Sequence, residues 1–347
     1  MPAKKHIRVV IADDSLVARE MLAQILATDP NIEVVGQAKN GQEAVDMVAN
    51  LRPDLVTMDI HMPVMDGLVA TERIMAFTPT PILVVSSSVH GEGMGSAFDA
   101  LTLGALEVIK KPEPKEWADL ERIGRDVLRK VKVLANVRVI THIGGRRGHA
   151  DRPMGVRPTR MTERRIVAIG SSTGGPSALL AVLAKLPSDF PVPILVAQHI
   201  ADGFVPGLVS WLDGGSQLKV VAATDGDRPV AGTVYFAPTG RNMVIEGATI
   251  RFERSGKGQL YIPSADTLFD SVARSFGERS VGVILTGMGA DGAEGLKTMY
   301  DKGAATIAQN EDTCTVFGMP RAAIELGAAS RVLPIEDIAT GILELVG

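Results

Sequence analysis

The sequence predicts an α/β protein with two domains. The first is a doubly wound (βα)5 domain, and the second is a mainly parallel α/β sheet domain with a β-hairpin. Short apolar runs without polar alternation recur along the chain, as in buried parallel strands. Amphipathic segments long enough for crossover helices separate these runs. The length of 347 residues also favours two domains, at roughly 150 residues per domain.

The first domain is predicted at residues 1–137 from five apolar runs that alternate with helical segments. The expected strands are IRVVIA (7–12), IEVVGQA (32–38), DLVTMD (54–59), PILVVSS (81–87) and ALEVIK (105–110). A last helix is expected from about Pro114 to about Val137. Five β-α units of this kind predict a parallel sheet with helices on both faces.

A flexible basic linker is predicted at residues 138–163, which are rich in glycine, proline and arginine and lack apolar periodicity. The window 121–165 holds 13 Lys or Arg against 4 Asp or Glu. This charge favours simple solvation over docking onto an acidic partner or nucleic acid, because no aromatic residues are interleaved with it.

The second domain is predicted at residues 164–347. RIVAIG (165–170), VPILVAQ (192–198) and VGVILTG (281–287) are the expected strands, each followed by a glycine- or proline-rich turn. Between them, residues 233–253 alternate with period two, which predicts a β-hairpin.

Composition limits the functions that the chain can have. The net charge is −4 and aromatic residues make up 4%, so neither property favours nucleic-acid binding. Cys314 is the single cysteine, which excludes internal disulfides and a cysteine-rich metal site. The N-terminus lacks the apolar core of a signal peptide, and no run reaches the ~18 apolar residues of a membrane span. These features predict a cytoplasmic protein without membrane insertion.

Polar side chains follow the strands of the first domain at one edge of the predicted sheet. Asp13 and Asp14 come after the first strand, Asp59 ends the third, Ser86 ends the fourth and Lys111 follows the fifth. Three converging carboxylates repel one another unless a hard cation such as Mg²⁺ lies among them. A carboxylate in this position can accept a phosphoryl group, while lysine and serine neutralise the phosphoryl oxygens.

This domain resembles response-regulator receiver domains in the segments VVIADDS (9–15), DLVTMDIHMPVMDG (54–67), VVSSS (84–88) and KKP (110–112). The resemblance implies phosphorylation of Asp59, with Mg²⁺ bound by Asp13, Asp14, Asp59 and the main-chain carbonyl of His61.

The same resemblance implies that Ser86 and Lys111 respond to the phosphoryl group. One position departs from the receiver pattern: Val108 stands where receivers often carry an aromatic switch residue. The route by which phosphorylation is transmitted is therefore left open.

A candidate nucleophile lies after the first strand of the second domain. Gly170, Ser172 and Gly174 match the pattern G-x-S-x-G, which places a serine on a sharp turn between a strand and a helix. Pro176 suits the first turn of that helix, whose free N–H groups can stabilise an oxyanion. The pattern is weak by itself.

A histidine and an aspartate could complete a catalytic triad. Of six histidines, only His199 belongs to the second domain, where it ends an apolar strand. Asp291 follows another strand and could orient the imidazole. The order Ser172, His199, Asp291 differs from the Ser-Asp-His order of α/β-hydrolases, so that superfamily is disfavoured.

A dinucleotide-binding fingerprint competes for the same segment. Residues 287–292 match G-x-G-x-x-G after a strand, and Glu311 and Asp312 follow about twenty residues later. The fingerprint normally opens a domain, however, and the carboxylate of Asp291 would repel a pyrophosphate. Both points disfavour dinucleotide binding, which is kept as an alternative.

The second domain resembles the protein-glutamate methylesterases of bacterial chemotaxis (CheB family). The matching segments are AIGSSTGGPSAL (168–179), AQHIADGF (197–204), YFAPTGRNM (235–243), PSADTLFDSVA (263–273), ILTGMGADGAEGLKTM (284–299) and AQNEDTCTVFGMPRAAIELGA (308–328). The resemblance implies a catalytic triad of Ser172, His199 and Asp291, with backbone oxyanion donors near Thr173 and Met288. No cofactor is expected in this domain.

The family resemblance also implies a function: phosphorylation-activated hydrolysis of glutamyl methyl esters, and deamidation of glutamines, on cytoplasmic helices of chemoreceptors. A chemotaxis histidine kinase would donate the phosphoryl group. The family often has histidine where Asn242 stands, a position assigned to substrate approach or packing. A receiver fused to a non-catalytic binding module is the alternative function, and release of methanol would distinguish the two.

Overall fold

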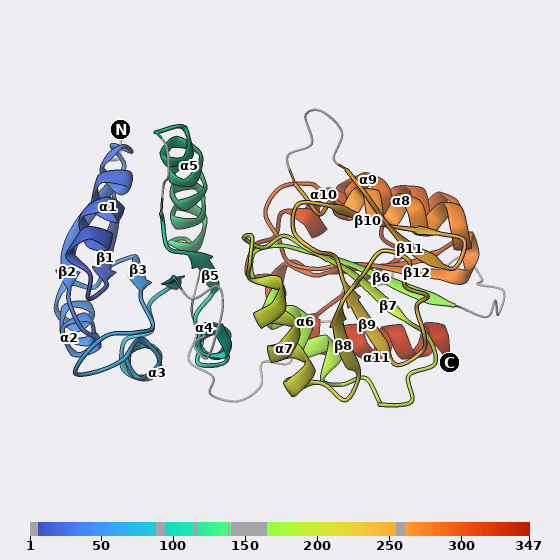
Figure 1. Ribbon diagram of the computed structural model, residues 1–347, viewed down its shortest axis with the longest axis horizontal. Helices are drawn as coiled ribbons and strands as arrows, with labels where there is room; N and C mark the ends of the chain where they lie inside the picture. The colour runs from blue at the N-terminus through green and yellow to red at the C-terminus, as the bar shows by residue number, and fades with distance from the viewer. Residues whose placement is uncertain (1–5, 88–93, 114–116, 138, 140–164, 255–260) are drawn as a thin grey trace. The chain divides into compact units, whose positions relative to one another are not determined.

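The protein is described by a computed structural model for residues 6–87, 94–113, 117–137, 139, 165–254 and 261–347 (Figure 1). The chain forms two compact units, Met1–Gly145 and Arg146–Gly347. The linker predicted at 138–163 lies outside the described residues, apart from Val139. Within those residues no helix has both the length and the apolar composition that a membrane crossing requires.

The N-terminal unit contains a five-stranded sheet with the order β2-β1-β3-β4-β5. All of its neighbouring strands are parallel, as predicted. The strands are β1 (Ile7–Ala12), β2 (Ile32–Ala38), β3 (Leu55–Met58), β4 (Ile82–Ser86) and β5 (Glu107–Lys110). Their ends agree with the predicted ends to within two residues, because continuous apolar runs mark buried parallel strands clearly.

Within the described residues of this unit, five helices cover the sheet. They are α1 (Leu16–Ala27), α2 (Gly41–Leu51), α3 (Gly67–Phe77), α4 (Met94–Thr102) and α5 (Trp117–Leu134). The side chains of Ser15, Asn40 and Asp66 cap the first three helices by accepting N–H groups of the first turn. The last helix ends at Leu134 instead of near Val137, and its expected start near Pro114 lies outside the described residues.

The C-terminal unit contains a seven-stranded sheet with the order β14-β13-β12-β6-β7-β9-β8. Every neighbouring pair is parallel. The strands are β6 (Ile166–Ser171), β7 (Ile194–Gln198), β8 (Lys219–Ala222), β9 (Thr233–Phe236), β12 (Ser280–Ile284), β13 (Ala305–Gln309) and β14 (Arg331–Leu333). The α/β class predicted for both domains is thus confirmed.

The hairpin prediction for residues 233–253 was wrong in its extent. Only β10 (Asn242–Glu246) and β11 (Thr249–Glu253) form an antiparallel pair, in a sheet of their own. The first part of the segment, β9, is a fully buried strand that pairs in parallel with β7 and β8. Alternation of apolar and polar residues cannot show which neighbour a strand pairs with. A strand of the hairpin and a strand of the large parallel sheet therefore have the same sequence pattern here.

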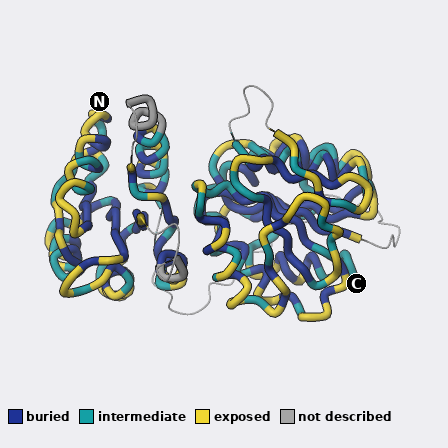
Figure 2. The backbone as a smooth tube through the Cα atoms, viewed as in Figure 1, coloured by how far each residue is buried: buried dark blue, intermediate teal, exposed yellow. Residues whose placement is uncertain are grey.

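Helices lie on both faces of the larger sheet (Figure 1). α6 (Gly175–Leu183), α7 (Val205–Gly215) and α11 (Ile335–Val346) pack on one face. The other face carries α8 (Ala265–Phe276), α9 (Ala293–Asp301), α10 (Met319–Glu325) and the β10–β11 hairpin. The strands between them are mostly buried (Figure 2).

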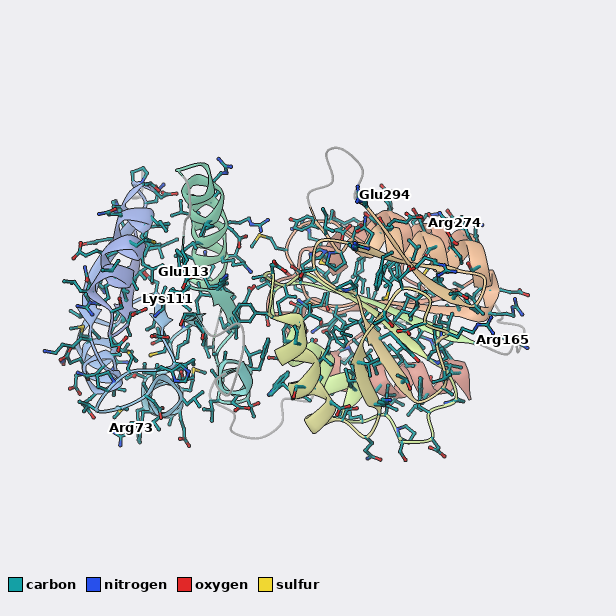
Figure 3. All side chains as sticks on the ribbon, in the orientation of Figure 1. Arg73, Lys111, Glu113, Arg165, Arg274 and Glu294 are labelled. Atoms are coloured by element: carbon teal, nitrogen blue, oxygen red, sulfur yellow. The ribbon has the colours of Figure 1, made fainter. Side chains whose placement is uncertain are left out.

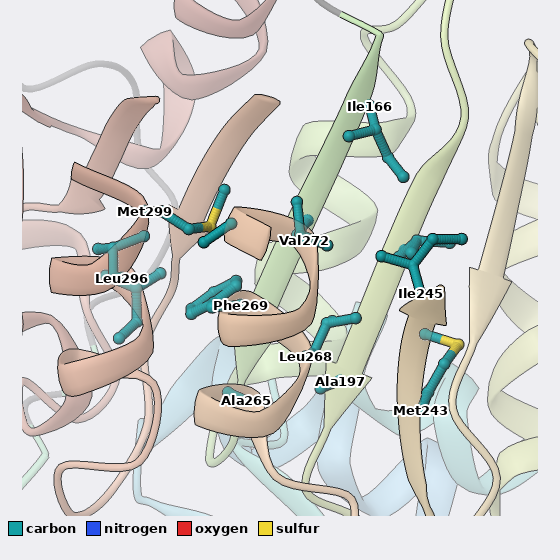
Figure 4. Close-up of a cluster of buried hydrophobic side chains, with 14 of the residues drawn as sticks. Ile166, Ala197, Met243, Ile245, Ala265, Leu268, Phe269, Val272, Leu296 and Met299 are labelled. Atoms are coloured by element: carbon teal, nitrogen blue, oxygen red, sulfur yellow. The ribbon is translucent and has the colours of Figure 1, made fainter. Parts of the chain in front are cut away.

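The hydrophobic core on the second face joins α8 to the hairpin and to α9 (Figure 4). Leu268, Phe269 and Val272 of α8 are fully buried, and they lie in one cluster with Met243 of β10 and Leu296 of α9. This core holds the N-terminus of α8 at a defined place beside the sheet.

Replacing Phe269 by alanine should destabilise the C-terminal unit by about 3–5 kcal/mol, because the buried ring leaves a cavity. Urea unfolding measures the change. Phe77→Ala is the control, since that ring is 80% exposed and should change the free energy of unfolding by less than about 0.5 kcal/mol. Equal losses at the two positions would contradict the described core.

Candidate active site

Three neighbouring strands of the C-terminal sheet end beside one another. From β6 the strand order continues to β7 on one side and to β12 on the other, so the direction of winding reverses at β6. Ligands of doubly wound folds bind at the carboxyl ends of the strands at such a reversal. Ser172 follows β6, His199 follows β7, and Asp291 lies in the loop between β12 and α9. The structure therefore brings the three positions to one edge of the sheet.

The turn that carries Ser172 is tied to its neighbours by hydrogen bonds. The Ser172 N–H donates to the carbonyl of Thr286 at 3.0 Å, and its carbonyl accepts from Gly175 N–H at 2.8 Å. A Cβ on Gly287 would lie only 2.7 Å from Cβ of Ser172, so the segment after β12 can approach the serine because this residue is glycine. Ser172 is 9% exposed.

His199 is paired with Asp291. Its Nε2 lies 2.7 Å from Oδ2 of Asp291. The backbone N–H of His199 donates to the Ser171 carbonyl at 3.0 Å. The imidazole stacks on the ring of Tyr261 with a centroid distance of 4.5 Å and an interplanar angle of 4°. The other ring nitrogen, Nδ1, is buried and has no hydrogen-bond partner among the described residues.

The Asp291 carboxylate occupies the N-terminus of α8. Oδ2 accepts from Ala265 N–H at 2.7 Å, and Oδ1 accepts from the Ser264 hydroxyl at 2.8 Å. Burial by itself raises the pKa of Asp291, but His199 and these donors outweigh burial and bring that pKa below its ordinary value. Asp291 is therefore a carboxylate at neutral pH.

Several residues that support this arrangement were not predicted. The Gln198 side chain donates to the carbonyls of Ser172 and His199 at 2.8 Å each, which links the two turns. The Thr286 hydroxyl donates to the Thr173 carbonyl at 2.9 Å. Gln198 ends one predicted strand and Thr286 is the last but one residue of another. Both could have been noticed as polar residues at the functional edge, but their partners cannot be inferred from the sequence.

The burial of Asn242 favours packing over substrate approach. It is 3% exposed, and its Oδ1 accepts from Ser264 N–H at 2.9 Å, immediately before α8. Cys314 is also no candidate nucleophile. Burial, together with the charge of Glu311, raises the pKa of its thiol to about 12. The thiol therefore stays protonated at neutral pH.

The geometry disfavours dinucleotide binding at residues 287–292. The fingerprint needs the N-terminus of the following helix for the pyrophosphate. At the N-terminus of α9, the carboxylate of Asp266 already accepts from Gly295 N–H at 2.7 Å. Asp291 lies in the same loop, so a pyrophosphate would meet two carboxylates.

The predicted acidic pocket of the N-terminal unit lies where its own sheet reverses, between β1 and β3. One oxygen from each of Asp13, Asp14 and Asp59 lies within 4.8 Å of the others. The Lys111 ammonium, labelled in Figure 3, is 2.7 Å from Oδ2 of Asp13 and 2.9 Å from Oδ2 of Asp59. Asp13 and Asp59 are buried, whereas Asp14 is exposed.

The electrostatics of this pocket suit a hard divalent cation. Burial raises the pKa of Asp59, although Lys111 acts against it. The clustered donors are all carboxylate oxygens, the ligand type that Mg²⁺ prefers. The buried Ser86 ends β4, and its carbonyl accepts from Lys111 N–H at 2.8 Å. His61 is exposed two residues after Asp59, and Val108 is buried in β5.

Comparisons with known proteins agree with both halves of the structure. Residues 167–342 match the family model of the CheB methylesterase, and residues 9–119 match that of the response regulator receiver domain. The Thermotoga maritima CheB methylesterase catalytic domain is similar in structure, with a TM-score of 0.50 and 39% identity. The similarity covers 53% of this chain and 100% of that one.

Curated relatives are similar over nearly the whole length. The protein-glutamate methylesterase/protein-glutamine glutaminase 2 of Anaeromyxobacter dehalogenans is 48% identical, with 98% of this chain and 97% of the relative covered. The protein-glutamate methylesterase/protein-glutamine glutaminase of Nitrosospira multiformis is 43% identical over the same shares. Both resemblances seen in the sequence are confirmed: the chain belongs to the CheB methylesterase family and carries an N-terminal response regulator receiver domain.

Proposed function

We propose that this protein is a phosphorylation-regulated protein-glutamate methylesterase and protein-glutamine glutaminase of chemotaxis. Its substrates are cytoplasmic helices of methyl-accepting chemoreceptors, so it works in the cytoplasm. The observation that carries the proposal is the pairing of His199 with Asp291 at 2.7 Å, at the sheet edge where Ser172 turns out of β6. The names of the relatives that are similar over nearly the whole length support the same activity.

The catalytic steps follow from the arrangement of the imidazole. With its proton on Nε2, His199 donates to Asp291, so the buried Nδ1 carries the free electron pair. Nδ1 takes the Ser172 proton while Oγ bonds to the ester carbonyl carbon. Collapse of the tetrahedral intermediate breaks the bond to the methoxy oxygen, which leaves as methanol with the proton from His199.

Water then completes the cycle. His199 takes a proton from water as the hydroxide attacks the acyl-enzyme, and Ser172 leaves with that proton, which yields glutamate. A glutamine side chain follows the same course with ammonia as the leaving group. Asp291 stabilises the imidazolium in both steps, because its carboxylate is held ionised at the N-terminus of α8.

The backbone N–H groups of Thr173 and Met288 are the proposed oxyanion donors. Thr173 follows the nucleophile, and Met288 follows Gly287, which lies against Ser172. Within the described part of the chain, neither N–H donates to a backbone carbonyl. Donors of this kind stabilise charge that develops on the substrate oxygen.

In the receiver domain, Asp59 accepts the phosphoryl group from a chemotaxis histidine kinase. Asp13, Asp14, Asp59 and the main-chain carbonyl of His61 would hold Mg²⁺, which neutralises phosphoryl charge. Lys111 already contacts Asp59, and Ser86 ends the neighbouring strand, so both are suited to respond to a phosphoryl group. Phosphorylation shifts an equilibrium between less active and more active states of the enzyme.

Ser172→Ala should lower methanol release from a methylated chemoreceptor by roughly 10³-fold or more, because the acyl-enzyme cannot form. Phosphorylation of Asp59 should be unchanged in this variant. Ser210→Ala, at an exposed serine of α7, is the matched control and should keep wild-type activity. Full activity of Ser172→Ala would refute the assignment, and a wild-type protein that binds receptor without releasing methanol would favour a binding module.

Asp59→Asn should abolish the stimulation of methanol release by a small phosphodonor with Mg²⁺, and removal of Mg²⁺ should have the same effect on the wild type. A tenfold stimulation corresponds to about 1.4 kcal/mol of difference between the two states. Asp46→Asn, at an exposed carboxylate of α2, is the control and should retain stimulation. Stimulation that survives in Asp59→Asn would show that another group controls the enzyme.

A further inference from the structure

A second carboxyl group, the half-buried Asp266, lies next to Asp291. Asp266 is the second residue of α8, and its backbone N–H is 3.4 Å from Oδ1 of Asp291. Its side chain turns to the next helix, where Oδ1 accepts from Gly295 N–H at 2.7 Å in the first turn of α9. Each aspartate therefore accepts a backbone N–H from the first turn of the other's helix. Asp291, in the loop before α9, accepts from α8, and Asp266, in α8, accepts from α9.

This pair of hydrogen bonds is built into close packing between the two helices. A Cβ on Gly295 would lie 2.6 Å from the carbonyl oxygen of Asp266, so α9 can approach α8 at this point only with glycine there. An anion at a helix N-terminus stabilises that helix and fixes the loop in front of it. The loop in front of α9 carries both Asp291 and Met288.

We propose that Asp266 is a positioning residue of the esterase centre: it anchors the loop that carries Asp291 and Met288, and its charge acts on His199 through Asp291. The inference rests on the proposed function, because it concerns the same reaction. Asp266 touches neither the substrate nor the nucleophile in this role. It sets the place of the loop and adds a second negative charge behind the Asp291–His199 pair.

Burial raises the pKa of Asp266 to about 6, and the nearby Asp291 carboxylate acts in the same direction, against the N–H of Gly295. Above that pH, Asp266 is ionised, and its negative charge stabilises the imidazolium form of His199. The imidazolium cannot act as a base, so this added charge should raise the pH below which activity falls.

Other charged or titratable groups lie on α8 and on the elements packed against it. Among the elements packed against α8, β6, β7 and β12 carry none within their bounds, and His199 directly follows β7. α9 carries Glu294, Lys297, Tyr300 and Asp301. Glu294 is exposed and is labelled in Figure 3, and Lys297 is paired with Asp301. The remaining such groups on or next to α8 are Glu246 of β10, Glu278 and Arg279 after α8, Tyr261 before it, and Asp270 and Arg274 within it.

The test is the pH profile of kcat/KM for methanol release by the full-length protein. Asp266→Asn keeps an oxygen acceptor for Gly295 N–H but removes the charge. The acidic limb of its profile should move to lower pH by about 0.5 to 1 unit, because the imidazolium loses a stabilising charge. Asp270→Asn, one turn further along the same helix, is the matched control and should leave the limb in place.

Asp266→Glu separates position from charge. The longer side chain keeps the negative charge but displaces the carboxylate from Gly295, so we expect a wild-type acidic limb with kcat lowered several-fold. If Asp266→Asn does not fold, Asp266→Glu still tests the positioning role. An unmoved limb in Asp266→Asn, or wild-type kcat in Asp266→Glu, would overturn the positioning role while the esterase activity stands. Absence of methanol release from the wild type would instead refute the proposed function.

Discussion

Both candidate sites depend on one constraint of parallel sheets: strands that run in the same direction end at the same edge. Where the chain winds away in two directions from one strand, the loops on either side diverge and leave the edge open. In the N-terminal unit this reversal lies between β1 and β3, where Asp13, Asp14 and Asp59 gather. In the C-terminal unit it lies at β6, beside His199 and Asp291. The same geometry thus serves two different chemistries, selected by the side chains at the strand ends.

Burial of carboxylates is the main energetic difficulty at both edges. An isolated buried carboxylate is strongly disfavoured, so each one needs a cation or several donors. Lys111 serves this purpose for Asp13 and Asp59. Asp291 relies on His199 and on the first N–H groups of α8. The hydrophobic core beneath α8 has a functional consequence, because it holds these N–H groups in place.

The sequence led to errors where strand pairing mattered. The segment 233–253 alternates throughout, yet its first part joins the large parallel sheet and only β10 and β11 form a hairpin. The strands β8, β13 and β14 were not predicted. β8 and β14 are short and partly exposed, whereas β13 is a buried strand that the sequence analysis missed. The hydrogen-bond partner of Asn242 could not be predicted either, because Ser264 lies 22 residues away in the sequence.

The α/β class, the strand ends of the N-terminal unit and the family could all be predicted from the sequence, because apolar runs and the residues that follow them are local properties of the chain. The sequence also identified Ser172, His199 and Asp291 as candidates, since chemistry-bearing side chains at strand ends stand out by type. The sequence could not show which nitrogen of His199 contacts Asp291 or which helix N-terminus holds that carboxylate, and the folded structure shows both. The folded structure also placed Asp266 behind Asp291. These are contacts between residues far apart in the chain, and they exist only after α8 and α9 have packed against the same sheet.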